Sequence, residues 1–163
     1  MTYSSFDPRV AFRENLGTLK YDEDANSYYC FTIKDKYNSD IKIPIYLSEE
    51  IKSGDEPNFP YIVMHIPEGG TTYEPQDVGA ATRKMETFIE VHIYFTDLDN
   101  IDRTEFAKKI KNELHDKVRS NQSTTTGIDF MNVEDDGLEK ETDGRRIYFH
   151  YLATLYCLYY DLC

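Results

Sequence analysis

The chain has 163 residues, of which 40% are hydrophobic and 29% are charged, which is enough apolar material for the core of one domain. Its formal net charge of -12 excludes a general basic field for holding nucleic-acid phosphates. No apolar run approaches the roughly 20 residues of a membrane helix, and residues 1–13 lack the apolar segment of a signal peptide. We therefore expect a soluble protein made in a reducing cytosol, with no membrane partner.

The N-terminal third of the chain is predicted to form a short helix followed by two strands. Asp7 and Pro8 suit the start of a helix, which Gly17 would stop. Residues 28–33 and 41–47 are rich in strand-forming side chains. The second segment has a proline at its centre. Because proline has no backbone N–H to donate to a sheet, we expect this strand to be bulged or to lie at an edge.

Two stronger strands are predicted in the middle of the chain, joined by a long connection. Residues 61–66 are apolar on both faces, which is typical of a strand at the centre of a sheet. Residues 67–84 read as a loop, and loops of this length are usually functional or disordered. Residues 85–96 alternate between apolar and polar side chains, so one face of this strand is expected to pack on the core.

An amphipathic helix is predicted over residues 102–119. Asp102 is placed to cap its first turn, and Glu105 three residues later completes the pattern of a capping box. Apolar side chains recur at helical spacing along one face. They are Phe106, Ile110, Leu114 and Val118. A polar linker, residues 120–127, ends the helix.

The remainder is predicted to contain a short strand, an acidic segment and a long aromatic strand. The short strand covers residues 128–133, and residues 134–144 read as a hairpin-like loop. Residues 145–160 favour a strand, which would span roughly 50 Å, longer than a small sheet needs. A bend, a bulge or an extension into a neighbouring subunit would account for that length. The fold class is therefore α+β: an antiparallel or mixed sheet with one well-defined helix and long hairpin-like loops.

Residues 132–143 loosely resemble a calcium-binding loop, but their pattern departs from it. Asn132 stands at the first ligand position, Lys140 at the ninth and Asp143, rather than a glutamate, at the twelfth. The flanking segments read as strands, not as the helices that such a loop joins. We favour a solvated acidic turn.

Candidate catalytic residues are few. The histidines (His65, His92, His115 and His150) show neither HxH nor HExxH spacing, so we interpret them as hydrogen-bonded sheet residues rather than metal ligands. His92 and His150 are expected on one sheet face. Glu86, Glu90 and His92 share one strand face and form the one arrangement that resembles a catalytic centre. The three cysteines (Cys30, Cys157 and Cys163) have no metal-type or redox-type spacing. We predict no catalytic residue, no metal and no cofactor.

Two charged loops, residues 67–84 and 134–146, are candidates for a contact surface, although a charged loop is often only solvated. Tyrosine is abundant, with 14 residues, and its ring suits interfaces where one end stays wet. The predicted interface combines residues of these loops with aromatic strand residues: Tyr73, Arg83, Lys84, Phe88, Tyr94, Asp135, Asp136, Arg145, Arg146, Tyr148 and Tyr156.

The order of these parts resembles the tail-terminator (tail-completion, head–tail joining) proteins of long-tailed phages and prophages. The resemblance runs from Phe59-Pro60 into the strand 61–66, through the strand 86–95 and the capped helix, to the aromatic segment 146–151. It covers about residues 57–160. The chain would then be a single domain, 1–163, with a core over 57–163 and a strand-rich extension over 1–56.

The resemblance implies a structural protein of the virion tail or neck, assembled in the host cytoplasm. Such proteins form hexameric rings that cap the tail tube and contact the head connector. The expected partners are copies of the chain itself, a tail-tube protein and a connector protein, with DNA passing through the lumen without sequence-specific binding. Two alternatives stay open. One is an acidic monomeric binding module such as a DNA mimic, and the other is a small metal-dependent hydrolase that uses Glu86, Glu90 and His92.

Overall fold

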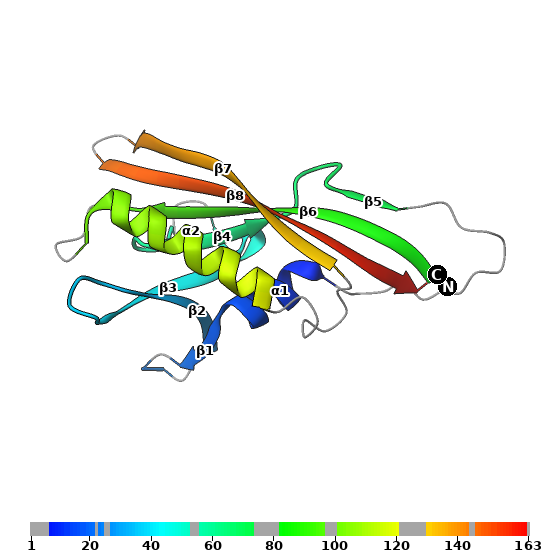
Figure 1. Cartoon of the computed structure of the whole chain (residues 1–163), viewed down its shortest axis with the longest axis horizontal. Helices are drawn as coiled ribbons and strands as arrows, with labels where there is room; N and C mark the ends of the chain where they lie inside the picture. The colour runs from blue at the N-terminus through cyan, green and yellow to red at the C-terminus, as the bar shows by residue number, and fades with distance from the viewer. Residues whose placement is uncertain are drawn as a thin grey trace.

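The computed structural model describes residues 7–162, with gaps at 22, 25–26, 53–55, 74–81, 97–100, 121–129 and 144–145. Its strands form one mixed sheet of eight, with two α-helices, as the α+β prediction requires (Figure 1). The helices are α1 (Pro8–Leu16) and α2 (Arg103–Ser120), and a short 3-10 helix, η1, covers Ser48–Glu50. The strands are β1 (Thr18–Tyr21), β2 (Ser27–Lys34), β3 (Asp40–Leu47), β4 (Tyr61–His65), β5 (Thr71–Tyr73), β6 (Thr82–Phe95), β7 (Phe130–Asp143) and β8 (Arg146–Leu162).

The strand order is β1-β2-β3-β4-β6-β8-β7, with β5 paired to β6 beside this path. All neighbours are antiparallel except β3 and β4, which are parallel. The strand 61–66 was predicted to be central, and β4 is indeed flanked by strands on both sides. Strands from the first 56 residues and strands from the rest of the chain therefore belong to one continuous sheet.

β3 is an interior strand with no register shift in either of its pairings, which contradicts the expectation that Pro44 would make it an edge strand or a bulged one. Pro44 lies opposite Cys30 of β2, whereas the pairing with β4 begins only at Ile45 and ends at Leu47. The proline thus precedes the stretch that needs partners on both sides, so a strand containing it is tolerated inside the sheet.

Both α-helices begin and end where the local signals predicted. The carboxylate of Asp7 accepts a hydrogen bond from the Arg9 N–H at 2.9 Å, Pro8 occupies the first turn, and Gly17 follows the last residue of α1. Asp102 accepts a hydrogen bond from the Glu105 N–H at 2.9 Å at the start of α2. These caps satisfy backbone donors that a helix leaves without internal partners.

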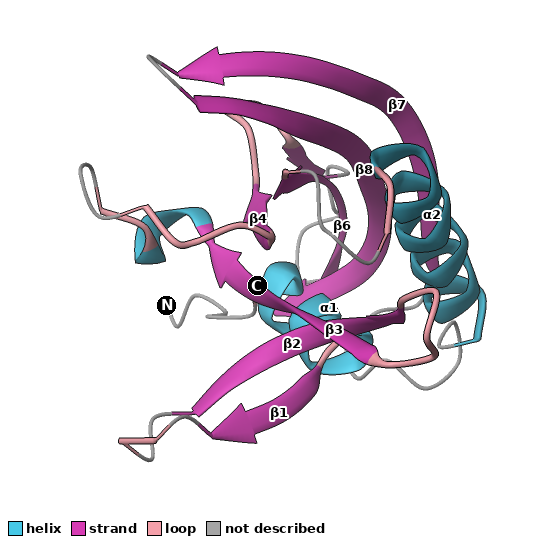
Figure 2. Ribbon diagram, turned by 90° about the vertical axis from the view of Figure 1, so that its left-hand side faces the viewer, coloured by secondary structure: helices cyan, strands magenta, loops and turns pink. Residues whose placement is uncertain are grey.

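The two helices lie on the same face of the sheet, where the hydrophobic core forms. The predicted apolar face of α2 is buried, with Ile110 fully inaccessible and Phe106 only 1% exposed. The Phe106 ring packs 4.5 Å from the ring of Phe95 on β6. The apolar residues of α1, led by Phe12, join the same core. Figure 2 shows α2 alongside the arch of β7 and β8, with α1 near β2 and β3.

Three long strands, β6, β8 and β7, make up the other half of the sheet and run along the length of the molecule (Figure 1). β8 pairs with β6 from Thr82 to Phe95 and with β7 from Phe130 to Asp143. The unusual length of the aromatic strand is thus matched by two partners within the same chain. No extension into a neighbouring subunit is needed to pair it.

Two segments predicted as loops are strands. The acidic stretch 134–144 was expected to be a solvated, hairpin-like loop, but residues 130–143 form the single strand β7. Its ladder with β8 supplies the backbone partners, and a bulge between Asp135 and Gly137 accommodates the glycine at a φ of 121°. The expected loop 67–84 contains β5 and the first residues of β6. The four-residue strand β1 was not predicted.

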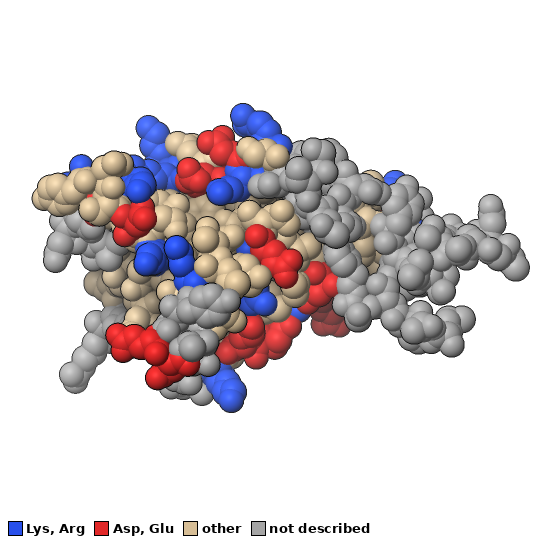
Figure 3. Space-filling view, turned by 90° about the horizontal axis from the view of Figure 1, so that it is seen from below, with Lys and Arg blue, Asp and Glu red and all other residues tan. Residues whose placement is uncertain are grey.

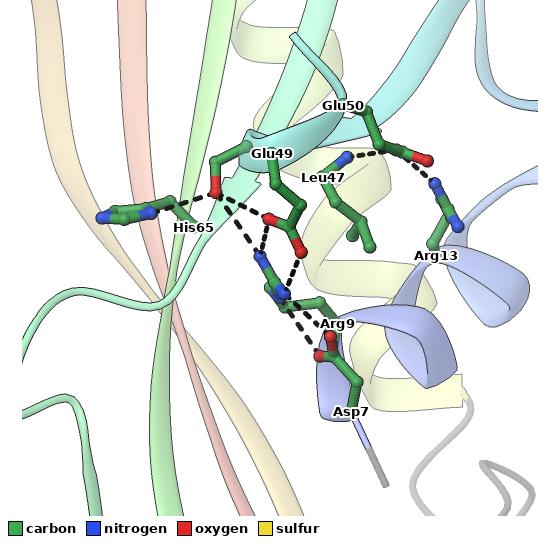
Figure 4. Close-up of polar contacts among 8 residues, drawn as sticks. Asp7, Arg9, Arg13, Leu47, Glu49, Glu50 and His65 are labelled. Atoms are coloured by element: carbon green, nitrogen blue, oxygen red, sulfur yellow. Dashed lines mark hydrogen bonds and ion pairs between the residues drawn. The ribbon is translucent and has the colours of Figure 1, made fainter. Parts of the chain in front are cut away.

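An ion-pair network ties α1 to η1 at the end of β3 (Figure 4). The Arg9 guanidinium donates to both oxygens of Glu49, at 2.6 and 2.7 Å, and also to Asp7. Arg13 donates to Glu50 at 2.7 Å, and Glu50 accepts the Leu47 N–H at 2.6 Å. The hydrogen bonds to Arg9 lower the pKa of Glu49 to about 2.

No described helix is both long and apolar enough to cross a membrane.

Candidate functional site

We call the sheet face opposite α1 and α2 the outer face. It carries every second residue of the long strands, from Glu86 to Tyr94 on β6 and from Tyr148 to Leu158 on β8. The intervening residues, such as Ile89 and Leu155, point into the core and are inaccessible. Among the described residues, neither α-helix covers the outer face, and most of its side chains are only partly buried.

Aromatic rings form a continuous strip across part of the outer face. Tyr61 lies 5.2 Å from Tyr94 and 5.7 Å from Phe59, between ring centroids. Phe59 in turn stacks on Tyr148 at 5.4 Å. Burial raises the pKa of Tyr94 to about 12, so this hydroxyl stays protonated at physiological pH. Further along β6, Phe88 packs 5.2 Å from Tyr156 and is 44% exposed.

Two histidines and two glutamates form a hydrogen-bonded chain beside this aromatic strip. Nδ1 of His92 lies 2.7 Å from Nε2 of His150, and Nε2 of His92 lies 2.8 Å from a carboxylate oxygen of Glu90. Nδ1 of His150 lies 3.0 Å from a carboxylate oxygen of Glu141 on β7. The prediction that His92 and His150 share a face is confirmed, and the two rings stack with centroids 4.9 Å apart.

The surroundings of this histidine–glutamate chain oppose a positive charge on the imidazole ring of His92. Burial lowers the pKa of His92, against the opposing effect of its bond to Glu90. The pKa of Glu141 is lowered mainly by a side-chain hydrogen bond from Tyr148. The hydrogen bond with His150 lowers it further. Imidazoles beside carboxylates can accept or donate protons and can bind cations.

The predicted catalytic trio is only partly assembled. Glu90 and His92 are in contact, but Glu86 lies opposite Leu158 and forms a side-chain hydrogen bond with Tyr156 instead. Sequence reasoning missed Glu139 and Glu141, which belong to the acidic segment that was interpreted as a loop. The alternation of acidic residues at 139 and 141 was the signal that a strand would bring both to one face.

The predicted contact residues fall into separate environments. Those on the outer face are Lys84, Phe88, Tyr94, Tyr148 and Tyr156. Tyr73, Arg83 and Arg146 have strand backbones, but their side chains lie outside the described residues, as does the whole of Arg145.

The two acidic contact residues, Asp135 and Asp136, point in opposite directions at the bulge. Asp136 accepts a hydrogen bond from Thr154 on the outer face at 2.5 Å. Asp135 faces α2, where it accepts a hydrogen bond from the Tyr151 hydroxyl and lies 3.3 Å from Nζ of Lys111 and 3.1 Å from His115. Asp135 is therefore engaged within the chain and is a poor candidate for a contact with another molecule.

The two ends of the outer face differ in charge. At the β1–β3 end, Lys20, Lys34 and Lys42 all lie near Asp40 and lower its pKa, chiefly through the hydrogen bond from Lys34. At the opposite end, β7 carries acidic side chains on the outer face. They are Glu134, Asp136, Glu139 and Glu141. Figure 3 shows a different arrangement on the side seen there, where acidic and basic side chains are intermixed.

No protein-family model matches the chain, and no curated protein matches it.

Proposed function

We propose that the protein is a structural subunit without catalytic activity that assembles head to tail into a ring, in the manner of phage tail-terminator proteins. The ring, a hexamer, would cap a tail tube and join it to the head connector in the virion neck. Its partners would be neighbouring copies of the chain, the tail-tube protein and the connector protein.

The observation that carries this proposal is the opposite charge at the two ends of the sheet. β1 and β7 are the terminal strands of the sheet order. The basic end presents Lys20 and Lys42 beside a Lys34–Asp40 ion pair, which leaves an excess of positive charge, and the acidic end presents the outward carboxylates of β7. A surface with positive charge at one end and negative charge at the other suits a heterologous contact, in which one end of a copy meets the opposite end of the next copy. Repeated heterologous contacts close into rings.

The surface at these ends favours contact through side chains rather than a continued sheet. β7 has a bulge and a dense row of charged side chains, and both features hinder backbone pairing along an edge strand. β1 has only four residues, which also limits such pairing. Between the two ends, the partly exposed Phe88 and Tyr156 offer apolar area that a neighbouring copy would bury.

Paired charge reversals test the head-to-tail arrangement. One variant carries Lys20→Glu and Lys42→Glu, and the other carries Glu134→Lys and Asp136→Lys. Each variant alone would place like charges across every contact and is expected to stay monomeric by native mass spectrometry. A mixture of the two restores opposite charges at every contact of an alternating ring, so assembly is expected to return only on mixing.

The matched control reverses two exposed charges of α2, Lys108→Glu and Asp116→Lys, and is expected to assemble like the natural chain. A natural chain that is monomeric at all concentrations, together with variants that fail to assemble on mixing, would contradict the ring. Oligomers that form equally well in both separate variants would show that the contact lies elsewhere.

The two alternative functions have less support. A DNA mimic needs a long acidic face, but Lys and Arg lie among the acidic side chains on the side shown in Figure 3. The alternative of a hydrolase that uses Glu86, Glu90 and His92 lacks one member of its trio, since Glu86 contacts Tyr156.

A further inference from the structure

We propose that Glu139, Glu141 and His150 form a binding site for a divalent transition-metal cation at the β7 side of the outer face. One ligand atom from each residue lies within 4.8 Å of the others. An imidazole nitrogen with two carboxylate oxygens is a donor set that Zn²⁺ and related cations accept. The site shares Glu139 and Glu141 with the acidic end of the proposed ring contact, but it needs only residues of one copy, so it can be tested on the monomeric chain.

The strand ladder holds the three side chains together. Glu139 lies directly opposite His150, and Glu141, two residues further along β7, lies opposite Tyr148. Residues two apart on a strand point to the same side, so both carboxylates flank the His150 ring. Glu139 is exposed and Glu141 is partly exposed, so small rotations of their side chains suffice to bring the oxygens to bonding distance.

There is room for a cation beside the ring. A pocket of about 60 Å³ lies next to His150 and is lined by Asp136, Gly137, Glu139, His150 and Leu152. Gly137 belongs to the bulge that interrupts the register of β7, and the bulge forms one wall of this pocket. The pocket is large enough for a cation with a water molecule that completes its coordination.

The hydrogen-bond inventory of the histidine–glutamate chain is satisfied by a cation at Nδ1 of His150. The three bonds that link Glu90, His92, His150 and Glu141 need three N–H donors, because carboxylates only accept. Two neutral imidazoles supply two, so the third bond requires either a second proton on one ring or a cation in its place. A cation can replace the proton between His150 and Glu141. The bonds that remain, from His92 to Glu90 and from His150 to His92, then need two N–H donors, and the two imidazole rings supply them without a positive charge.

In that arrangement His92 is a positioning residue. The Nε2–H of His150 donates to Nδ1 of His92, and the Nε2–H of His92 donates to Glu90. Such outer contacts fix the tautomer and the ring orientation of a histidine ligand. They leave Nδ1 of His150 with a lone pair directed toward Glu139 and Glu141.

Calorimetric titration with Zn²⁺ tests the site. The natural chain is expected to bind one equivalent. Glu139→Gln and His150→Asn are each expected to weaken binding at least about tenfold, and His92→Gln is expected to weaken it by about tenfold while one equivalent still binds. Glu139 is exposed, so its substitution leaves the fold intact, and circular dichroism checks the folding of the two histidine variants.

Matched controls are His65→Asn and His115→Asn, which remove the other two histidines, and Glu134→Gln, which removes an acid of the same strand. All three are expected to bind Zn²⁺ like the natural chain. Co²⁺ bound in place of Zn²⁺ would report nitrogen and oxygen ligands through its visible absorption, which His150→Asn should change.

Three outcomes would overturn the proposal. The first is a natural chain that does not bind Zn²⁺. The second is an adventitious ion only, recognised by binding that His65→Asn or His115→Asn weakens and Glu139→Gln does not. The third is equal affinity for Ca²⁺ that survives His150→Asn, which would assign the binding to carboxylates alone.

Discussion

The Arg9 guanidinium on α1 contacts the Glu49 carboxylate through two hydrogen bonds, of 2.6 and 2.7 Å, although the two residues are 40 positions apart in the sequence. The contact is bidentate, and the Arg9 side chain is only 12% exposed. It joins a short helix, nine residues long, to the end of β3. A helix of this length needs tertiary contacts to be stable.

Replacement of Arg9 should loosen this attachment. Arg9→Lys keeps the charge but cannot form the bidentate contact, and we expect it to lower the free energy of unfolding by about 1 kcal/mol in urea denaturation. Glu14→Gln, at an exposed position on the same helix, is the control and should change the value by no more than about 0.5 kcal/mol. An Arg9→Lys variant as stable as the natural chain would show that the contact adds nothing.

The same contact predicts a pH dependence. The pKa of Glu49 falls from 4.5 to about 2 in the folded protein, mainly because of its hydrogen bonds to Arg9. A carboxylate with a depressed folded-state pKa stabilises the fold above its unfolded pKa and loses this contribution as the pH falls through the folded value. The stability difference between the natural chain and Glu49→Gln should therefore be full at pH 6 and shrink between pH 4.5 and 2. A difference that is constant over this range would contradict the assignment.

The sequence predicts a structural feature well when the residues that determine it are neighbours in the chain, and less well when the feature depends on pairing with another segment. The helix caps at Asp7 and Asp102 depend on neighbouring residues, and both predictions are confirmed. The alternation of β6 correctly placed His92 toward the outer face. The interior position of β3 was missed because it depends on a parallel pairing with β4, which the residues of β3 alone do not indicate.

The acidic strand shows the same limit most clearly. Residues 134–143 have low strand propensity, and Gly137 suggested a turn, yet the full-length ladder with β8 overrides both preferences. Because the segment was interpreted as a loop, Glu139 and Glu141 were not associated with His150. Glu90, His92 and His150 of the histidine–glutamate chain were therefore expected on one sheet face from strand periodicity, whereas the position of Glu141 depended on a long-range pairing.

The bulge at Gly137 gives a further prediction. Its φ of 121° is a conformation that residues with a side chain rarely adopt, although a Cβ there would meet no neighbouring atom. Gly137→Ala should thus lower the free energy of unfolding by about 1–3 kcal/mol through backbone strain alone. Gly69, at a φ of 75° with equally open surroundings, is the comparison. Gly69→Asn should cost less, because asparagine tolerates the left-handed region.

Thiol chemistry offers a test of the core. Cys157 is inaccessible, and burial raises its pKa to about 12. We expect iodoacetamide to leave Cys157 unmodified in the folded protein at pH 8 and to alkylate it once urea unfolds the chain, as read by peptide mass spectrometry. Rapid alkylation of Cys157 under native conditions would mean that β8 opens frequently or is less buried than described.

The position of β8 between β6 and β7 has a consequence for synthesis on the ribosome. β8 follows both of its neighbours in the chain, so β6 and β7 leave the ribosome before the strand that joins them. Until residues 146–162 emerge, β6 has strand partners on one side only and β7 has none among the described strands, and core residues such as Ile89 and Val133 lack the side chains of β8 that cover them. A nascent chain with unpaired strand edges and exposed apolar surface is prone to aggregate. This protein should therefore depend on chaperones that bind the nascent chain until the ribosome has released β8.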